Sequence, residues 1–289
     1  MIVVRSADEL PARDERAVAL GSFDGVHLGH RRVIEESIAA GGTPTVVTFH
    51  PHPRRVLGYG VELLTTLERR LELLAELGIE ETLVVEFSLE FQRVEPEEFA
   101  RRYLEAIGAR VVLAGEDFRF GHRRAGDLDL LRRLGLEARA VPLLEGVSSS
   151  EIRRLLHGGE VDQAAPLLGR PPEVEGTVVE GDARGGTLGF PTANLAVDPE
   201  LLVPAHGIYA GFAGGHRAAI SIGTNPHYGG EELRVEAFLL GFAGDLYGRR
   251  LIVELWKRLR DERAFSSEQE LIDQIARDVE ETERAPRPV

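Results

Sequence analysis

The sequence predicts two domains of different fold class: an α/β domain with a parallel sheet over residues 1–170, and an antiparallel β-barrel with a C-terminal helix over residues 171–289. Three observations lead to this prediction. The chain of 289 residues is longer than a usual single domain. Short apolar runs alternate with helical patterns in its first half, whereas glycine-rich turns separate strand-like runs in its second half. The pattern changes at "GRPP" near residue 170, a composition typical of linkers.

Five runs in the first half have the continuous apolar pattern of strands that are buried on both faces of a parallel sheet. They are residues 17–20, 43–49, 81–87, 110–115 and 137–143. Helical patterns lie between them, in "HRRVIEESIAAGG", "LERRLELLAELG", "PEEFARRYLEAIG" and "LDLLRRLG". Several of these end in glycine, as helix C-termini often do. The alternation predicts a doubly wound α/β domain.

The second half contains strand-like runs without helical alternation, which favours an antiparallel barrel. These runs are "EVEGTVVEGD", "GIYAGFAG", "HRAAISIG", "RVEAFLLGF" and "RRLIVELW". The segment 266–283 instead has helical periodicity, with Leu271, Ile272, Ile275 and Val279 on one face. We therefore expect one amphipathic helix near the end of the chain.

Composition and charge exclude several classes of protein. The chain has no cysteine, which rules out disulfide and thiolate chemistry, and its net charge of -14 argues against a nucleic-acid partner. No run approaches the roughly 18 apolar residues that a membrane span needs. The N-terminus lacks the pattern of a signal peptide. We expect a soluble cytoplasmic protein without a nucleic-acid or membrane partner, and no feature requires an oligomer, so a monomer is compatible with the sequence.

The chain contains a single lysine, Lys257, among 34 basic residues. A P-loop requires a lysine directly after glycine, whereas Lys257 follows Trp256. A Walker-type ATPase is therefore excluded. Any phosphate group must be bound by arginine, histidine, backbone N–H groups or a metal ion.

The stretch "GSFDGVHLGH", residues 21–30, lies where the first strand ends and the first helix begins. Open α/β sheets bind their ligands at this edge, and a helix N-terminus attracts anions. Gly21 and Gly25 permit a close backbone approach, and His27 and His30 share one face of the first turn. Two imidazoles at such a helix end would suit a triphosphate whose leaving oxygens gain charge.

Two alternatives remain open for these histidines. For an isolated H-x-x-H pattern, a pair of exposed helix histidines is the more common interpretation. A zinc site is the second alternative, because His50 and His52 in "FHPHP" lie at the end of the next predicted strand. No H-E-x-x-H pattern supports zinc.

Three ordered motifs resemble those of a known family. "GSFDGVHLGH" resembles the G-x-F-D-x-x-H-x-G-H signature of the nucleotidyltransferase superfamily. With "GEDFRFG" (115–121) and "SSSEIRRLL" (148–156), the chain resembles the bacterial bifunctional riboflavin kinase/FMN adenylyltransferases, or FAD synthetases. The resemblance implies a Rossmann-like nucleotidyltransferase domain. It also implies that catalytic and ATP-binding residues lie in the first motif: His27 and His30, with Gly21, Phe23, Asp24, Gly25 and Gly29.

The third motif and two further residues are expected to complete the first site. Ser149 and Ser150 either cap the helix that follows or bind phosphate oxygens, and Arg153 would neutralise the departing pyrophosphate. Convergence with the other motifs favours phosphate binding. The resemblance implies flavin contacts for His52 and Asp117, although a strand end and a turn are the alternatives for these two residues.

"GGTLGFPTANL" (185–195) resembles the glycine-rich loop and Pro-Thr-Ala-Asn motif of riboflavin kinases, and the likeness extends through "LRDERAF". Thr192 and Asn194 would supply oxygens to Mg²⁺ and nucleotide phosphates, with a simple β-turn as the alternative. The resemblance implies that Glu236 deprotonates the riboflavin 5′-hydroxyl; a surface glutamate paired with Arg234 is the alternative. Phe265, in "LRDERAF", is expected at the flavin.

The sequence departs from the family pattern at three positions. Gly186 stands where arginine is common, and His227 and Tyr228 stand where a Thr-Phe pair is usual. These departures concern the flavin contacts and the glycine-rich loop.

The predicted function is therefore the two-step synthesis of FAD. The C-terminal domain would phosphorylate riboflavin with ATP to FMN, and the N-terminal domain would adenylylate FMN to FAD and release pyrophosphate, with Mg²⁺ at both sites. A nucleotidyltransferase with another acceptor, such as phosphopantetheine, is one alternative. A flavin-storage or zinc-binding protein without enzymatic activity is the other.

Overall fold

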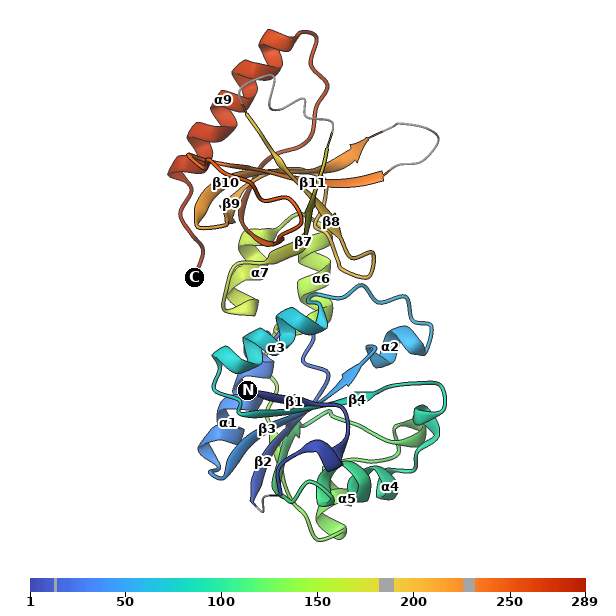
Figure 1. The fold of residues 1–289 in the computed structure, drawn as a ribbon. Helices are drawn as coiled ribbons and strands as arrows, with labels where there is room; N and C mark the ends of the chain where they lie inside the picture. Colours follow the sequence, from blue (N-terminus) through green and yellow to red (C-terminus); the bar gives the residue numbers. More distant parts are fainter. Residues whose placement is uncertain (13–14, 182–189, 226–231) are drawn as a thin grey trace. The chain divides into compact units, whose positions relative to one another are not determined.

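The computed structural model describes residues 1–12, 15–181, 190–225 and 232–289 (Figure 1). Contacts within the chain divide it into two compact units, which we call the N-terminal unit (Met1–Ser149) and the C-terminal unit (Ser150–Val289). This division precedes the boundary expected at 170/171, since the segment after Ser149 groups with the barrel. The functional boundary at 170/171 stays a prediction.

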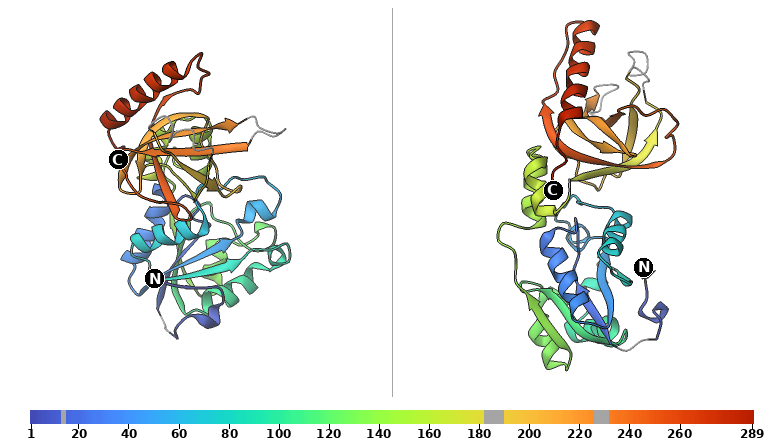
Figure 2. Two further views of the ribbon diagram at one scale, coloured as in Figure 1. Left: turned by 45° about the horizontal axis from the view of Figure 1, so that its top comes forward. Right: turned by 90° about the vertical axis from the view of Figure 1, so that its left-hand side faces the viewer.

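The N-terminal unit contains the predicted parallel sheet, with six strands in the order β1-β4-β3-β2-β5-β6 (Figures 1 and 2). The strands are β1 (Ile2–Val4), β2 (Arg16–Leu20), β3 (Thr43–His50), β4 (Glu81–Glu86), β5 (Ala109–Gly115) and β6 (Glu137–Val141). Five of them match the predicted runs. The sequence reading missed β1, a three-residue edge strand in which Ile2 and Val3 are exposed and leave no buried apolar run.

Helices cover both faces of this sheet, as the doubly wound fold requires. On one face, α1 (Leu28–Ala39) and α3 (Leu67–Glu76) pack against alternate strand residues. On the other face lie α4 (Pro96–Ala100) and α5 (Leu128–Arg133). Shorter helical pieces are α2 (Pro53–Val56), 3₁₀ turns at Ala7–Glu9, Phe91–Arg93 and His122–Arg124, and a π-type turn at Arg101–Glu105.

A buried ion pair joins the amino ends of β2 and β4. Arg16 and Glu81 are each 1% exposed, and Arg16 Nε lies 2.6 Å from Glu81 Oε2. The other two nitrogens of Arg16 donate to the carbonyl oxygens of Ile107 and Pro11. All three guanidinium nitrogens therefore have acceptors, as expected of a buried arginine that serves the fold.

The C-terminal unit is the predicted antiparallel barrel, closed in the order β10-β11-β8-β7-β12-β9. Its strands are β7 (Glu173–Val179), β8 (Ala193–Val197), β9 (Gly207–Ala213), β10 (His216–Asn225), β11 (Glu232–Leu239) and β12 (Arg250–Arg260). Its helices are α7 (Val161–Leu168) and α9 (Glu268–Arg284), and α6 (Ser149–His157) spans the division between the units. The sequence does not predict β8, whose first residues end the stretch "GGTLGFPTANL" that resembles a glycine-rich loop and Pro-Thr-Ala-Asn motif. No helix in the described part of the chain is long and apolar enough to cross a membrane.

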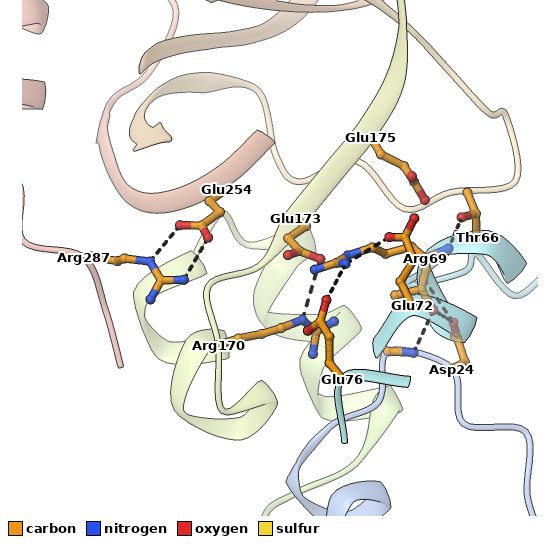
Figure 3. A network of polar contacts seen from close by, with 12 residues as sticks. Asp24, Thr66, Arg69, Glu72, Glu76, Arg170, Glu173, Glu175, Glu254 and Arg287 are labelled. Carbon is orange, nitrogen blue, oxygen red and sulfur yellow. Dashed lines mark hydrogen bonds and ion pairs between the residues drawn. The ribbon is translucent and has the colours of Figure 1, made fainter. Parts of the chain in front are cut away.

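The C-terminal end of α9 is fixed to the barrel by arginines. Arg217 Nη1 donates to the carbonyl oxygens of Thr282 at 2.9 Å and Ala285 at 2.7 Å. Its guanidinium carbon lies 5.1 Å from the ring centroid of Trp256. Beyond the helix, Arg287 forms a two-bonded ion pair with Glu254 (Figure 3). The two Arg217 hydrogen bonds satisfy carbonyl groups that a helix end leaves without intrahelical partners.

We expect Arg217→Met to destabilise the C-terminal unit by about 1.5–3 kcal/mol, since charge-assisted hydrogen bonds to two carbonyl groups are lost. Trp256 is the only tryptophan in the chain, so its emission during denaturant unfolding reports on this unit. Arg284→Met is the matched control, because Arg284 is 76% exposed and pairs with the exposed Glu280 at the same helix end. An exposed pair contributes about 0–1 kcal/mol. Equal losses in both variants would contradict the anchoring of α9 through Arg217.

Candidate active sites

The chain makes a tight turn between β2 and α1, at the edge of the sheet where the first motif was predicted to bind ATP. Phe23, Gly25 and Val26 have φ angles of 51°, 82° and 39°, in the left-handed region. A Cβ atom on Gly25 would lie 2.7 Å from Leu64 Cδ1. Glycine is therefore required at this position for both backbone conformation and space.

The carboxylate of Asp24 fixes this turn to the segment before α3. Asp24 is 2% exposed, and its Oδ1 accepts hydrogen bonds from the backbone N–H groups of Leu64 at 3.0 Å and Thr65 at 3.2 Å. Thr65 Oγ1 in turn accepts from the N–H of Gly25 at 3.2 Å. The carboxylate therefore positions the loop. The nucleotide contact predicted for Asp24 stays a prediction.

His27 and His30 lie together at the first turn of α1, as their spacing predicted. His27 is the N-cap residue, and its Nδ1 accepts the backbone N–H of His30 at 3.3 Å. This bond places the proton of the neutral ring on Nε2. The two rings stack with centroids 3.6 Å apart, and Phe23 contacts His30 edge-on. A Cβ atom on Gly29 would lie 3.2 Å from the His27 ring, so glycine at this position leaves room for the imidazole.

The start of α6 contacts the same loop. Ser149 Oγ donates to the carbonyl oxygen of Asp24 at 3.2 Å, which joins the third motif to the first within the N-terminal unit. Ser150 is exposed and Arg153 is half-buried, and both belong to the C-terminal unit. Their predicted roles at the phosphates stay predictions.

His52 and Asp117 follow β3 and β5, the two neighbours of β2 in the sheet. His52 is buried, and its Nδ1 accepts the N–H of Arg54 at 3.3 Å as the N-cap of α2. Asp117 is exposed in the turn after β5. The parallel sheet thus brings all three strand-end segments to one edge. The predicted flavin contacts of His52 and Asp117 stay predictions.

Histidine and carboxylate side chains are not gathered for metal binding in the described ranges. No group of three or more His, Asp or Glu residues that could hold a metal ion occurs among the residues that the structure describes. The zinc alternative for His27, His30, His50 and His52 gains no support from this arrangement.

The C-terminal unit contains a pocket of about 290 Å³ between outward-facing residues of β10 and β11 and the helix α9. Ser221 and Glu236 are cross-strand partners in its lining, and so are Ala219 and Phe238. Phe190 packs edge-on against Phe238 at 5.4 Å. The other lining residues include Thr192, Ile208, Arg260, Arg263, Phe265, Leu271, Ile275 and Asp278. The pocket is mostly apolar with a few polar groups, as small-molecule sites usually are.

Three predicted residues meet in or beside this pocket. Glu236 is half-buried, and its Oε2 lies 3.4 Å from Thr192 Oγ1. Asn194 is the cross-strand partner of Glu236 on β8, which places the two side chains on the same face. A Cβ atom on Gly181 would lie 2.2–2.7 Å from the side-chain amide atoms of Asn194, so glycine leaves room for that amide. Thr192 and Asn194 therefore lie close to Glu236, as expected if their oxygens serve the same site. Their binding of Mg²⁺ and nucleotide phosphates stays a prediction.

The wall of the pocket includes residues that the sequence reading did not single out. Arg260 holds Asp278 of α9 by a two-pronged ion pair, with Nε to Oδ1 at 3.0 Å and Nη2 to Oδ2 at 2.7 Å. The Arg263 guanidinium lies 4.9 Å from the ring centroid of Phe265, the predicted flavin contact. Asp278 is a charged residue on the buried side of an amphipathic helix, a signal that could have revealed it. Gly186, His227 and Tyr228 lie outside the described residues.

Two family models together match most of the chain. A model described as FAD synthetase matches residues 10–150, and one described as riboflavin kinase matches residues 168–285. The first range contains His27, His30 and Ser149, and the second contains Thr192 and Glu236, whereas Arg153 lies between the two ranges. The motifs that gave the resemblance thus belong to two families, one in each part of the chain.

Individual relatives match over nearly the whole length. A Bacillus subtilis bifunctional riboflavin kinase/FMN adenylyltransferase is 37% identical over 288 residues, which cover 92% of this chain and 91% of the relative. The Escherichia coli K12 protein with the same name is 35% identical, with 90% of each chain covered. A crystal structure from Streptococcus pneumoniae, described as a macrolide-efflux protein, has a TM-score of 0.89, 32% identity and 99% coverage of both chains. On this similarity the chain belongs to the family of bifunctional riboflavin kinase/FMN adenylyltransferases.

Proposed function

We propose that the C-terminal unit converts riboflavin and ATP to FMN and ADP, and that the N-terminal unit converts FMN and ATP to FAD and pyrophosphate. The observation that carries the assignment is the pocket in which a half-buried carboxylate, Glu236, lies beside Thr192 and among aromatic side chains. An apolar pocket of this kind suits a flat ring system, and the carboxylate suits the activation of a hydroxyl group.

In the first reaction, Glu236 acts as the general base. It accepts the proton of the riboflavin 5′-hydroxyl while that oxygen attacks the γ-phosphorus of ATP and the bond to ADP breaks. Phe190 and Phe238 line the pocket and exclude water from the attacking group. Oxygen groups of Thr192 and Asn194, near the Glu236 carboxylate, are the hard ligands that Mg²⁺ prefers. When bound, Mg²⁺ supplies positive charge that neutralises the phosphate oxygens.

In the second reaction, an FMN phosphate oxygen attacks the α-phosphorus of ATP, and the bond to pyrophosphate breaks. No covalent intermediate is required, because binding and charge stabilisation lower the barrier. His27, with its proton on Nε2, and His30 donate to phosphate oxygens at the N-terminus of α1. The loop from Gly21 to Gly25, with Phe23, surrounds the nucleotide, and Ser149, which donates to the Asp24 carbonyl oxygen, receives the leaving group. The phosphate roles of Ser150 and Arg153 stay predictions.

The remaining partners follow from the chemistry of the sites. Riboflavin, FMN and ATP are the small-molecule substrates. A net charge of -14 disfavours nucleic acid as a further partner. Catalysis by a monomer in the cytoplasm is part of the proposal.

Incubation of the native protein with riboflavin, ATP and Mg²⁺ tests the proposal directly. Chromatographic separation of the flavins over time should show FMN first and FAD later. A folded protein that forms neither product would refute the proposed function. FMN without FAD, or FAD only from added FMN, would refute one half of it.

Two substitutions should separate the reactions. We expect His30→Ala to slow FAD formation from FMN by about 10²-fold or more, because a donor to the leaving pyrophosphate is lost. Glu236→Gln should slow FMN formation from riboflavin by about 10²–10⁴-fold, because the isosteric amide cannot act as a base. Each variant should keep the other half-reaction, since distant sites act independently. Equal loss of both activities in either variant, with a normal thermal melt, would contradict the assignment.

Metal requirements provide a separate test. We expect EDTA to abolish both half-reactions and excess Mg²⁺ to restore them, because bound Mg²⁺ would neutralise the charge of the phosphate groups. A zinc-selective chelator should leave both rates unchanged. Metal analysis of the purified protein serves as the control, and stoichiometric zinc that is needed for activity would contradict this expectation.

A further inference from the structure

Arg70 in helix α3 is fully buried and has 0% of its side chain exposed. It faces the sheet from the same side of the helix as Leu73 and Leu74, which belong to the hydrophobic core. A charged side chain in such a position is costly unless it serves a structural or functional purpose.

A single nitrogen of Arg70 joins the carboxyl ends of two neighbouring strands. Nη1 donates to the carbonyl oxygen of Ser22 at 2.8 Å, to that of Phe49 at 3.2 Å and to Thr48 Oγ1 at 3.3 Å. Thr48 Oγ1 also donates to the Ser22 carbonyl oxygen at 3.1 Å. Ser22 begins the loop that leads to His27 and His30. Phe49 lies near the end of β3, shortly before His52.

The bonding of Arg70 differs from that of Arg16, which is also fully buried. Arg16 sits at the opposite, amino end of the sheet, pairs with Glu81 and donates through all three nitrogens. Among the described residues, by contrast, Nε and Nη2 of Arg70 are buried without a hydrogen-bond partner. Burial lowers the pKa of the Arg70 guanidinium, and the negative charge of Asp24 opposes that effect.

These contacts indicate that Arg70 serves the active-site edge of the sheet rather than the stability of the fold. A buried arginine that serves only the fold would have its donors satisfied, as Arg16 does. Arg70 instead donates hydrogen bonds through Nη1 alone, and it links the two loops that carry the predicted nucleotide and flavin contacts. A shift of such loops by about 1 Å is enough to slow a reaction about 10²-fold.

We propose that Arg70 is a positioning residue for FAD formation, which holds the β2–α1 loop and the end of β3 in register through Nη1. The inference rests on the proposed placement of FAD formation in the N-terminal unit. Arg70 is not assigned a contact with substrate. Its effect is exerted through Ser22, Thr48 and Phe49.

Substitutions at Arg70 in the full-length protein test this proposal. We expect Arg70→Met to lower kcat for FAD formation by about 10²-fold, with a smaller change in KM for FMN and ATP. Arg70→Lys should recover the rate to within about 5-fold of native, because one ammonium nitrogen has three donors for the same three oxygens. A role in stability alone would not give this split between kcat and KM together with rescue by lysine.

Arg16→Met is the matched control, since it removes an equally buried arginine from the same sheet at its other end. At a temperature where thermal melts show all variants folded, it should leave kcat for FAD formation within about 3-fold of native. Phosphorylation of riboflavin by the same preparations reports the concentration of intact enzyme. Equal losses in Arg70→Met and Arg16→Met, or an Arg70→Lys variant as slow as Arg70→Met, would overturn the proposal.

Thr48→Val keeps the test decisive if Arg70→Met does not fold. This nearly isosteric change removes the hydroxyl that bonds both Arg70 and the Ser22 carbonyl, and we expect about a 10-fold loss in kcat for FAD formation. A folded Thr48→Val protein with the native rate would refute the positioning role. If the native protein forms no FAD, the proposed function itself fails. If the native protein forms FAD and the Arg70 variants form it at the native rate, the proposed function stands and only this inference fails.

Discussion

The Asp24 carboxylate is the group on which the arrangement of the first site depends. It bonds the N–H groups of Leu64 and Thr65 and so ties the loop after β2 to the start of α3. The backbone carbonyl oxygen of Asp24 accepts a hydrogen bond from Ser149 Oγ, in the third motif. The loop after β2 also contains the left-handed turn at Phe23 to Val26 and the N-cap residue His27. It begins at Ser22, whose carbonyl oxygen accepts a hydrogen bond from Arg70. Buried hydrogen bonds of this kind give a loop the rigidity that catalysis requires.

Phosphate chemistry without a P-loop lysine is a constraint shared by both sites. The chain has one lysine, so the proposed phosphate contacts are a helix N-terminus, imidazoles and hydroxyls in the N-terminal unit, and neutral oxygens with Mg²⁺ in the barrel. The proposed groups lie at the N-terminus of a helix that follows β2 in the first site, and on or next to barrel strands in the second. The scaffold therefore supplies the precision that flexible side chains would lack.

The fold could be predicted where burial leaves a pattern in the sequence. Strands β2 to β5 are mainly buried apolar runs, and α9 has a clear helical period, so the sheet and this helix were predicted correctly. The edge strand β6 was also predicted, although three of its five residues are exposed. Strand β1 has too few buried residues to leave such a pattern. The pairing of Thr192 with Glu236 required knowledge of the barrel register, which no local motif contains. Arg70 was missed because arginine is ordinarily read as exposed, although it lies three and four residues before the buried Leu73 and Leu74.

On this interpretation, the loop held by Asp24 sets the geometry for FAD formation and leaves riboflavin phosphorylation unaffected. Asp24→Asn tests it most directly, because the amide keeps the shape of the side chain but turns one oxygen that faces the Leu64 N–H group into a donor. The quantity to measure is the ratio of the two initial rates in one preparation, which is independent of protein concentration. We expect the ratio of FAD formation to riboflavin phosphorylation to fall about 10²-fold. An unchanged ratio in a folded Asp24→Asn protein would contradict the account.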